Sequence, residues 1–220
     1  MFRQKKFSGI DFHNHFISCA TIKLERGIPV LQDIEKIKLD EDMIVGGRVS
    51  QAEVISDLLE DALREGVLSK EVHLAIPTQN ILIRKITSLP DIGEKELAKL
   101  LQFEVGERIH LPFENPIYDF VKIGSILPDS MEEKDEIDEE TLSLDDLAQG
   151  IQKDLEGPKS EILLFATSQS LSQDLADVCD DAGLKPQTAE IRGLALQRLL
   201  SYAHPRWLND IEMIIDASEN

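Results

Sequence analysis

Alternation of apolar and polar side chains is the first feature of the chain. Within residues 9–39, apolar positions such as Ile10 and Phe12 stand at every second residue between polar neighbours, which is the period of a half-buried strand. Gly27 supplies a turn, and residues 28–39 begin a return strand. The pattern predicts a hairpin in a sheet near the N-terminus.

Helical spacing follows this alternation. Across residues 50–64 the apolar positions recur three and four residues apart, Ser50 stands where an N-cap is expected, and Gly66 comes just after the end. Asp91 is likewise placed to cap a second helix, which Pro112 cannot extend.

The remaining apolar runs continue the mixture of strands and helices. We expect further strands at 72–76, 81–86, 118–123, 161–167 and 211–216, and further helices at 170–182 and 190–202. The order of these elements predicts an α/β protein.

Charge changes this picture in one place. The chain carries a net charge of -19, and residues 129–156 hold twelve acidic residues against two lysines. We interpret this stretch as a solvated surface loop, because so many like charges repel and few apolar residues are present to fold it. A cation site or a docking tail for a basic partner is the alternative.

The acidic balance also limits the classes of function. A field of this sign repels phosphate backbones and anionic lipid headgroups, so we expect no nucleic-acid binding. No stretch of the sequence has the length and apolar character of a membrane span or a signal-peptide core. We therefore expect a cytoplasmic protein without direct membrane insertion.

Few residues suggest chemistry of their own. Asp11, His13 and His15 alternate and would share a strand face as three potential metal ligands. We favour a loop with two exposed imidazoles, and predict no metal, because a zinc site normally needs a further ligand or water. Cys19 and Cys179 are far apart in the sequence and are expected to be small buried side chains.

Longer motifs carry a family resemblance. They are GID at Gly9–Asp11, HLAIP at His73–Pro77, IRKITSLPDIGEKELAKLLQFEVGERIHLPFENPIYDF at Ile83–Phe120, LLFATSQS from Leu163 and DDAGLKPQTAEIRGLALQRLL from Asp180. On these motifs the chain resembles the PilM family of type IV pilus machines, which is actin-like and related to FtsA, over about Ser8–Asn220.

The resemblance implies a specific α/β architecture. It is the first lobe of an actin-like, ribonuclease H-like fold, with the second lobe absent. The main subdomain would comprise residues 1–75 and 186–220, and a small α/β subdomain would be inserted at 76–185, including the acidic loop at about 129–156.

ATP is the cofactor that the resemblance implies for intact members, yet this sequence departs from their phosphate loops. Such loops have the form D-x-G, where glycine lets the backbone approach the anion. The first loop contains Asp11, His13 and Asn14, with His13 in the glycine position, and the second reads Asp216-Ala217-Ser218. We therefore expect a chain without enzymatic activity and without a cofactor.

A protein partner is the other implication of the resemblance. PilM-like proteins hold the cytoplasmic N-terminal peptide of the membrane protein PilN in a groove between the main lobe and the inserted subdomain. This chain would then be a non-catalytic scaffold of a type IV pilus, competence or secretion machine, peripheral at the inner face of the cell membrane, with homo-oligomers left open. The candidate groove residues are Phe103, Ile109, Leu111, Pro112, Phe113 and Arg192.

Alternative interpretations remain at this stage. Phe103 and Phe113 would, in the simplest case, fill the core of the subdomain. An ATPase of the FtsA type would require glycine in the first loop, and an enzyme of the sugar-kinase branch would require an adenosine lobe. A secretion scaffold of the GspL type would share the lobe but normally continue into a membrane helix.

Overall fold

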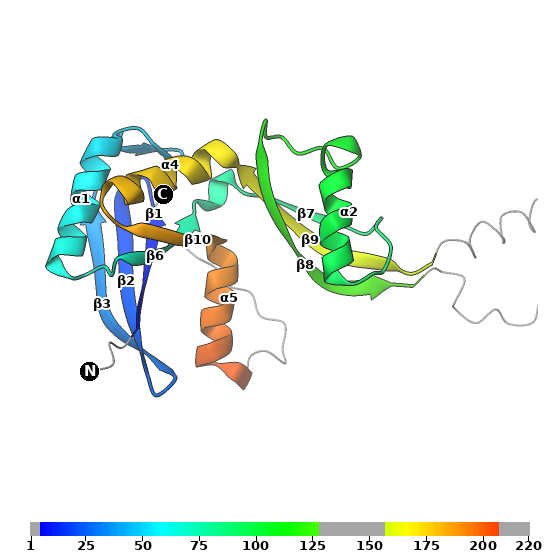
Figure 1. Ribbon diagram of the computed structural model, residues 1–220, viewed down its shortest axis with the longest axis horizontal. Coiled ribbons are helices and arrows are strands. Elements are labelled where there is room, and N and C mark those ends of the chain that lie inside the picture. Colours follow the sequence, from blue (N-terminus) through cyan, green and yellow to red (C-terminus); the bar gives the residue numbers. More distant parts are fainter. Residues whose placement is uncertain (1–4, 128–156, 207–220) are drawn as a thin grey trace, which may run out of the picture. The chain divides into compact units, whose positions relative to one another are not determined.

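The computed structural model describes residues 5–127 and 157–206, which divide into two compact units (Figure 1). Unit 1 comprises residues 1–81 and 167–220, and unit 2 comprises residues 82–166. The acidic loop expected at 129–156, the strand expected at 211–216 and the loop at Asp216 lie outside the described residues.

Unit 1 is built on a five-stranded sheet in the order β10-β6-β1-β2-β3. The strands β1 (Lys6–Phe12), β2 (Phe16–Glu25) and β3 (Ile28–Lys38) form an antiparallel meander, while β6 (Glu71–Ile76) is parallel to β1 and β10 (Lys185–Ile191) is parallel to β6. The N-terminal hairpin predicted around Gly27 is confirmed, and Gly27 adopts a φ of 85° that favours glycine.

Period-two alternation explains which face of this sheet is buried. Ile10 and Phe12 on β1 and Ile17 and Cys19 on β2 point to one face and are almost fully buried. The two cysteines are buried in this core, as the sequence predicted, and burial raises the pKa of each thiol to about 12.

Two helices cover that face. The first, α1 (Ala52–Glu65), buries Ile55 and Leu59, and α4 (Gln169–Asp181) buries Leu175 and Val178 in the same cluster. Gly66 ends α1 in the left-handed conformation, as expected, but the N-cap is Gln51 rather than Ser50.

Strand β10 was not predicted from the sequence. A helix was expected from residue 190, whereas Lys185–Ile191 is extended and only Arg192–Ala203 forms α5. The segment KPQTAEI has no strand-like alternation, because this edge strand is largely exposed. Its extended conformation is supported by pairing with β6, a contact between residues more than a hundred positions apart. A small hairpin of β4 (Ile44–Val45) and β5 (Arg48–Val49) was also not predicted.

The described residues of unit 2 form a three-stranded sheet with one helix. The strand order is β7-β9-β8, formed by Leu82–Ile86, Lys159–Ser168 and Pro116–Ile126. The helix α2 (Glu94–Glu107) buries Leu97 and Leu101 against Ile162 and Leu164 of β9. Each unit therefore has a hydrophobic core of its own.

The predicted capping role of Asp91 is wrong. The N-cap of α2 is Gly93, whereas the Asp91 carboxylate accepts hydrogen bonds from Lys122 Nζ and from Ser160 Oγ. The hydrogen bond from Lys122 is the main reason that the pKa of Asp91 lies below its usual value. Asp91 thus joins the segment before α2 to strands β8 and β9.

The boundaries of the units differ from the expected 1–75, 76–185 and 186–220. The compact units divide after Ile81 and after Ala166, so α4 belongs to unit 1. The physical reason is that its apolar side chains pack into the core of the five-stranded sheet. Within the described ranges, no helix combines the length and the apolar character needed to cross a membrane.

Candidate functional site at the carboxyl end of β1

Ligands of open α/β sheets bind at the carboxyl ends of parallel strands, and in unit 1 three such ends meet. Strands β1, β6 and β10 run parallel, and their register places Asp11, Ala75 and Glu190 in one row. Helix α5 begins directly after β10, with Arg192 as its first residue. Ala75 lies between Asp11 and Glu190 in this row. Its small side chain leaves space above β6 for the longer side chains of the neighbouring strands.

The centre of the site is an ion pair between Asp11 and Arg192. Arg192 Nη2 donates a hydrogen bond of 2.8 Å to Asp11 Oδ1, and both side chains are mostly buried. On the other side, His13 Nε2 lies 3.2 Å from Asp11 Oδ2. Both carboxylate oxygens of Asp11 therefore face nitrogen atoms of the chain's own side chains.

His13 occupies the turn between β1 and β2. Its backbone N–H donates to the carbonyl of Phe16 at 3.0 Å, and its ring stacks on the Phe16 ring with centroids 4.1 Å apart. The side chain is buried, whereas that of His15 is exposed. The expectation of two exposed imidazoles is therefore wrong for His13, because the Phe16 ring and Asp11 both contact it.

The three alternating residues do not form a common cluster either. Residues 13–15 turn away from the strand, so His15 does not share a strand face with Asp11. Among the residues that the structure describes, no three His, Cys, Asp or Glu side chains gather as a metal site would require.

A neighbouring hairpin closes over the same turn. The Gly47 N–H donates to Asn14 Oδ1 at 3.2 Å, and Asn80 Nδ2 donates to the Gly46 carbonyl at 2.8 Å. Gly47 has a φ of 77°, and a Cβ at this position would lie 2.8 Å from Cβ of Pro77. The turn at Gly46–Gly47 thus packs tightly on Asn14 and on residues 77–80.

The candidate partner-binding residues are divided between the two units. Arg192 lies in unit 1 in the ion pair described above, and the others lie in unit 2, on α2 and in the turn that follows it. Phe103 is 75% exposed and does not belong to the core, while Ile109 is buried and Leu111 packs against the same core.

The rest of that turn is more accessible. Pro112 is exposed and Phe113 is half-buried. The interpretation of Phe103 as a core residue is therefore wrong, since its side chain projects from the outer face of α2.

Unit 2 has a second apolar surface that was not predicted from the sequence. Helix α2 covers one face of the sheet, with Tyr118 and Phe120 turned toward it. The opposite face exposes about half of each of four aliphatic side chains, namely Ile83 on β7 and Ile117, Val121 and Ile123 on β8. We call these four residues the open face of unit 2. Its signal in the sequence is the run IYDFVKI, which has apolar residues on both faces of one strand.

Comparisons with known proteins bear on the fold. No protein-family model matches the chain, and neither does any curated protein. Among solved structures, a chain of a "PilM-PilN type IV pilus biogenesis complex" is similar with a TM-score of 0.66 and 15% sequence identity, over 91% of this chain and 52% of that one.

Two further solved structures are similar at lower scores. The cytoplasmic domain of EpsL, an inner-membrane component of the type II secretion system of Vibrio cholerae, gives a TM-score of 0.45 at 7% identity over 84% of this chain and 57% of that one. A Bacteroides thetaiotaomicron protein with an actin-like ATPase fold and unknown function gives 0.43 at 12% identity over 91% and 57%.

The first of these likenesses shows the fold. The predicted α/β architecture, an actin-like lobe with a small inserted α/β unit, is confirmed. The chain spans about half the length of the protein in the pilus complex.

Proposed function

We propose that this chain is a non-catalytic scaffold of a type IV pilus or type II secretion assembly machine, and that it binds the cytoplasmic N-terminal peptide of a PilN-like membrane protein. The observation that carries the proposal is the match of 91% of the chain, at a TM-score of 0.66, to a protein solved in a PilM–PilN complex. Position at the inner face of the cell membrane would follow from the partner.

A scaffold role is supported by the state of the first phosphate loop. A nucleotide-binding loop of this fold needs a small residue beside its phosphates and a carboxylate that faces the metal–phosphate group. In this chain His13 takes the place of the small residue, and the Asp11 carboxylate is engaged by Arg192 and His13. These residues do not fit a nucleotide, so we propose that the chain works without ATP and without enzymatic activity.

Binding of an extended peptide is supported by the shape of unit 2. Strand β8 has eleven residues and is an edge strand of its sheet, with β9 as its neighbour on one side. An extended peptide gains affinity by pairing its backbone with such an edge and by placing alternate side chains on an apolar surface. The open face of unit 2 supplies that surface next to the edge.

Phe103, Pro112 and Phe113 offer a second set of contacts on the other side of unit 2. Phe103 is 75% exposed, and together with the exposed Pro112 it would add apolar contact area for a partner. The acidic stretch at 129–156 follows β8 in the sequence, so a partner peptide with basic residues would be attracted to this unit.

The test is a calorimetric titration of the chain with a synthetic copy of the N-terminal peptide of the PilN-like protein from the same genome. We expect saturable binding with a Kd on the order of micromolar, which corresponds to about 8 kcal/mol. A parallel titration with Mg-ATP should give no heat of binding. ATP binding without peptide binding would contradict the scaffold and return the chain to the actin-like ATPases.

A further inference from the structure

Basic side chains gather where several strands of unit 1 begin or end, along one edge of the sheet that runs across the strands. Strands β1, β6 and β10 begin at this edge and β2 ends there, opposite to the edge that carries Asp11 and Arg192. The turn between β2 and β3 projects from it at the lower end of the unit (Figure 1). Together the strand ends and the turn contribute Lys5, Lys6, Lys23, Arg26, Lys70 and Lys185.

Acidic side chains at the same strand ends are fewer. Glu25 pairs with Lys23 at 3.1 Å, and Glu71 lies 3.9 Å from Lys5. On the strand ends and the turn themselves, six basic residues stand against two acidic ones, while Glu65, Asp180 and Asp181 end helices α1 and α4 shortly before β6 and β10. We call the set of six basic residues the basic edge.

One pair of like charges lies within the basic edge. Lys6 and Lys23 are directly opposite each other in the antiparallel pair of β1 and β2, and like charges at such positions repel. An external group of negative charge would relieve this repulsion.

Exposed aliphatic side chains lie next to the charges. Leu24 is 41% exposed and Ile28 is 59% exposed, and they flank a tight turn in which Arg26 and Gly27 both have positive φ. Basic residues beside exposed aliphatic ones are typical of surfaces that lie in a membrane interface, where the charges meet headgroups and the aliphatic groups enter the acyl boundary.

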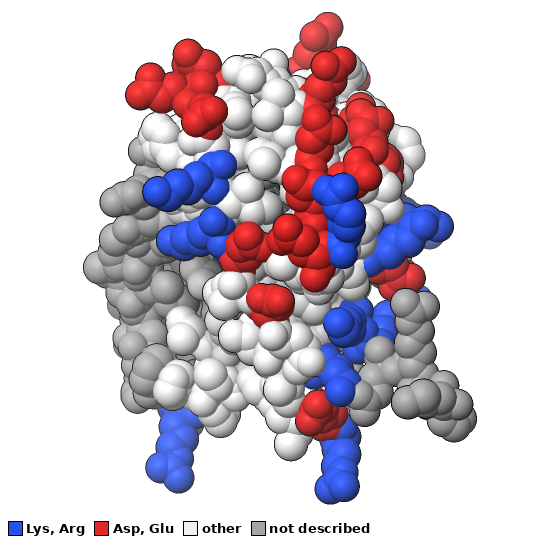
Figure 2. Space-filling view, turned by 90° about the vertical axis from the view of Figure 1, so that its left-hand side faces the viewer, with Lys and Arg blue, Asp and Glu red and all other residues white. Residues whose placement is uncertain are grey.

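The total negative charge of the chain does not forbid such contact. Figure 2 shows that most acidic side chains on one side of the molecule lie in its upper and middle parts, while the lower part carries mainly Lys and Arg around an uncharged area. At physiological ionic strength charges act over about 8 Å, so a lipid surface meets the local charge of the edge it approaches rather than the net charge.

We propose that the basic edge docks on an anionic lipid surface. The Lys and Arg side chains contact the headgroups, and Leu24 and Ile28 enter the interface from the tip of the β2–β3 turn. The projecting tip can enter a lipid surface because that surface deforms around it. A protein partner would need a groove of matching shape to receive it. The contact is independent of the peptide binding proposed above, so either can fail without the other.

The experiment is co-sedimentation of the 220-residue chain with two kinds of vesicle, phosphatidylcholine alone and phosphatidylcholine mixed with phosphatidylglycerol. We expect binding only to the vesicles with phosphatidylglycerol, with a steep loss as salt is added. Reversal of two exposed charges, in Lys6→Glu with Arg26→Glu, should weaken the binding about tenfold or more, since each basic residue near an anionic surface contributes to the attraction and each acidic one opposes it.

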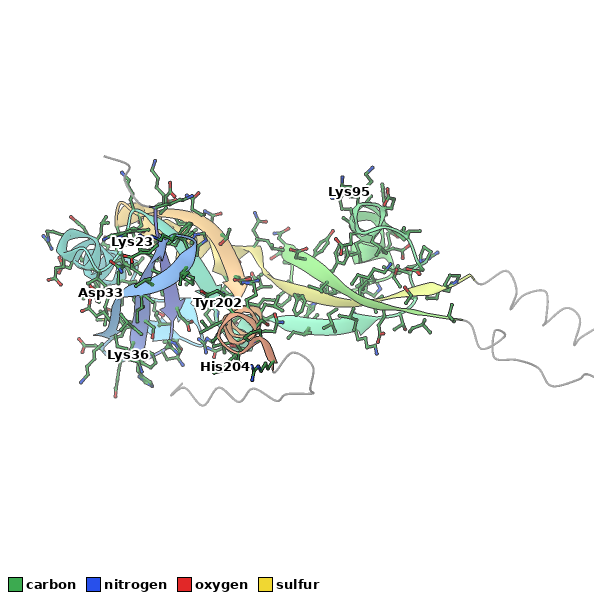
Figure 3. The ribbon with its side chains drawn as sticks, turned by 90° about the horizontal axis from the view of Figure 1, so that it is seen from below. Lys23, Asp33, Lys36, Lys95, Tyr202 and His204 are labelled. Carbon is green, nitrogen blue, oxygen red and sulfur yellow. The ribbon has the colours of Figure 1, made fainter. Side chains whose placement is uncertain are left out.

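A matched control is available on β3. Lys36→Glu with Lys38→Glu makes the same change of charge at exposed positions toward the other end of the strand. Figure 3 shows that Lys36 and Lys23 point to opposite sides of the sheet. This control should leave binding within about twofold of the unchanged chain, because a lipid surface at the basic edge lies beyond the screening distance.

Three results would overturn the proposal. They are equal binding to both kinds of vesicle, an equal loss in the Lys36 and Lys38 variant, and binding of poly-glutamate at the basic edge without any binding of vesicles. The last result would identify an acidic protein segment as the occupant.

Discussion

Arg192, the first residue of α5, donates a hydrogen bond of 2.8 Å to Asp11 near the end of β1, across 181 positions of sequence. The bond joins the first strand of the sheet to α5, the last helix that the structure describes in unit 1.

Loss of this pair should destabilise unit 1. We expect Arg192→Ala to lower the free energy of unfolding by about 1–3 kcal/mol, because the mostly buried carboxylate of Asp11 loses its charged partner. Urea denaturation measures the change. The control is Arg198→Ala on the same helix, whose partner Glu190 forms an exposed ion pair with it; that variant should cost about 0.5 kcal/mol or less. Equal losses of unfolding free energy in the two variants would show that the Asp11–Arg192 pair stabilises unit 1 no more than an exposed ion pair does.

Gly47 should tolerate no side chain. In Gly47→Ala the new Cβ would lie 2.8 Å from Cβ of Pro77, in addition to the strain of a φ of 77°. Gly27→Ala is the matched control, since Gly27 has a φ of 85° but nothing within 4 Å of the added atom. We expect Gly27→Ala to cost about 1 kcal/mol from strain alone, and Gly47→Ala to cost about 1–3 kcal/mol more because of overpacking. Thermal unfolding that ranks the two variants together would contradict the close packing of this turn.

Asp91 should make stability depend on acidity. Its pKa is lowered in the folded chain, chiefly by the hydrogen bond from Lys122, so the folded state binds a proton less readily than the unfolded one. The resulting stabilisation is present above the unfolded pKa of about 3.9 and is lost as pH falls through the lower folded pKa. Asp91→Asn should therefore reduce the urea midpoint at neutral pH and flatten its decline in acid.

The control for Asp91 is Glu114→Gln, an exposed acidic residue of the same unit. That variant should keep the acid-dependent decline of the unchanged chain. If the urea midpoint of Asp91→Asn also falls in acid, other carboxylates cause the decline.

Peptide binding should depend on the open face of unit 2. Val121→Asp places a charge among the aliphatic side chains of β8, and we expect it to weaken binding of the PilN-like peptide about tenfold or more, since an unpaired carboxylate must lose its water on contact. Leu199→Asp on α5, which also replaces an exposed aliphatic side chain by a carboxylate, should leave the affinity within about twofold. Calorimetry with both variants, after circular dichroism has shown intact folding, decides the point.

Local signals in the sequence predicted the elements that depend on local structure. The alternation through Ile10 and Phe12 indicated the first strands, and Gly66 indicated the end of α1 in its left-handed conformation. Strand β10 was missed because its extended form depends on β6 rather than on its own pattern.

Side-chain partners distant in sequence explain the other differences. Asp91 has the sequence context of a helix cap, but Lys122 and Ser160 bind its carboxylate from strands that come later in the chain. His13 was predicted to be exposed because nothing in its neighbourhood indicated that its ring would stack on Phe16. The ion pair of Asp11 and Arg192 could not be predicted, because the local sequence around each residue does not indicate its partner.

The two junctions between unit 1 and unit 2 are neighbours in the structure. Leu82 and Ala166 are register partners on β7 and β9, and the Thr167 hydroxyl donates to the Asn80 carbonyl at 2.9 Å just outside them. Because the two ends of unit 2 lie next to each other, the insertion does not separate the segments of unit 1 that it joins. The sheet of unit 1 can therefore form with or without unit 2. Excision of residues 82–166, with a short glycine turn from Ile81 to Thr167, should therefore leave a smaller protein that still folds, and the inserted unit is free to diverge to suit a new partner while its host keeps the same architecture.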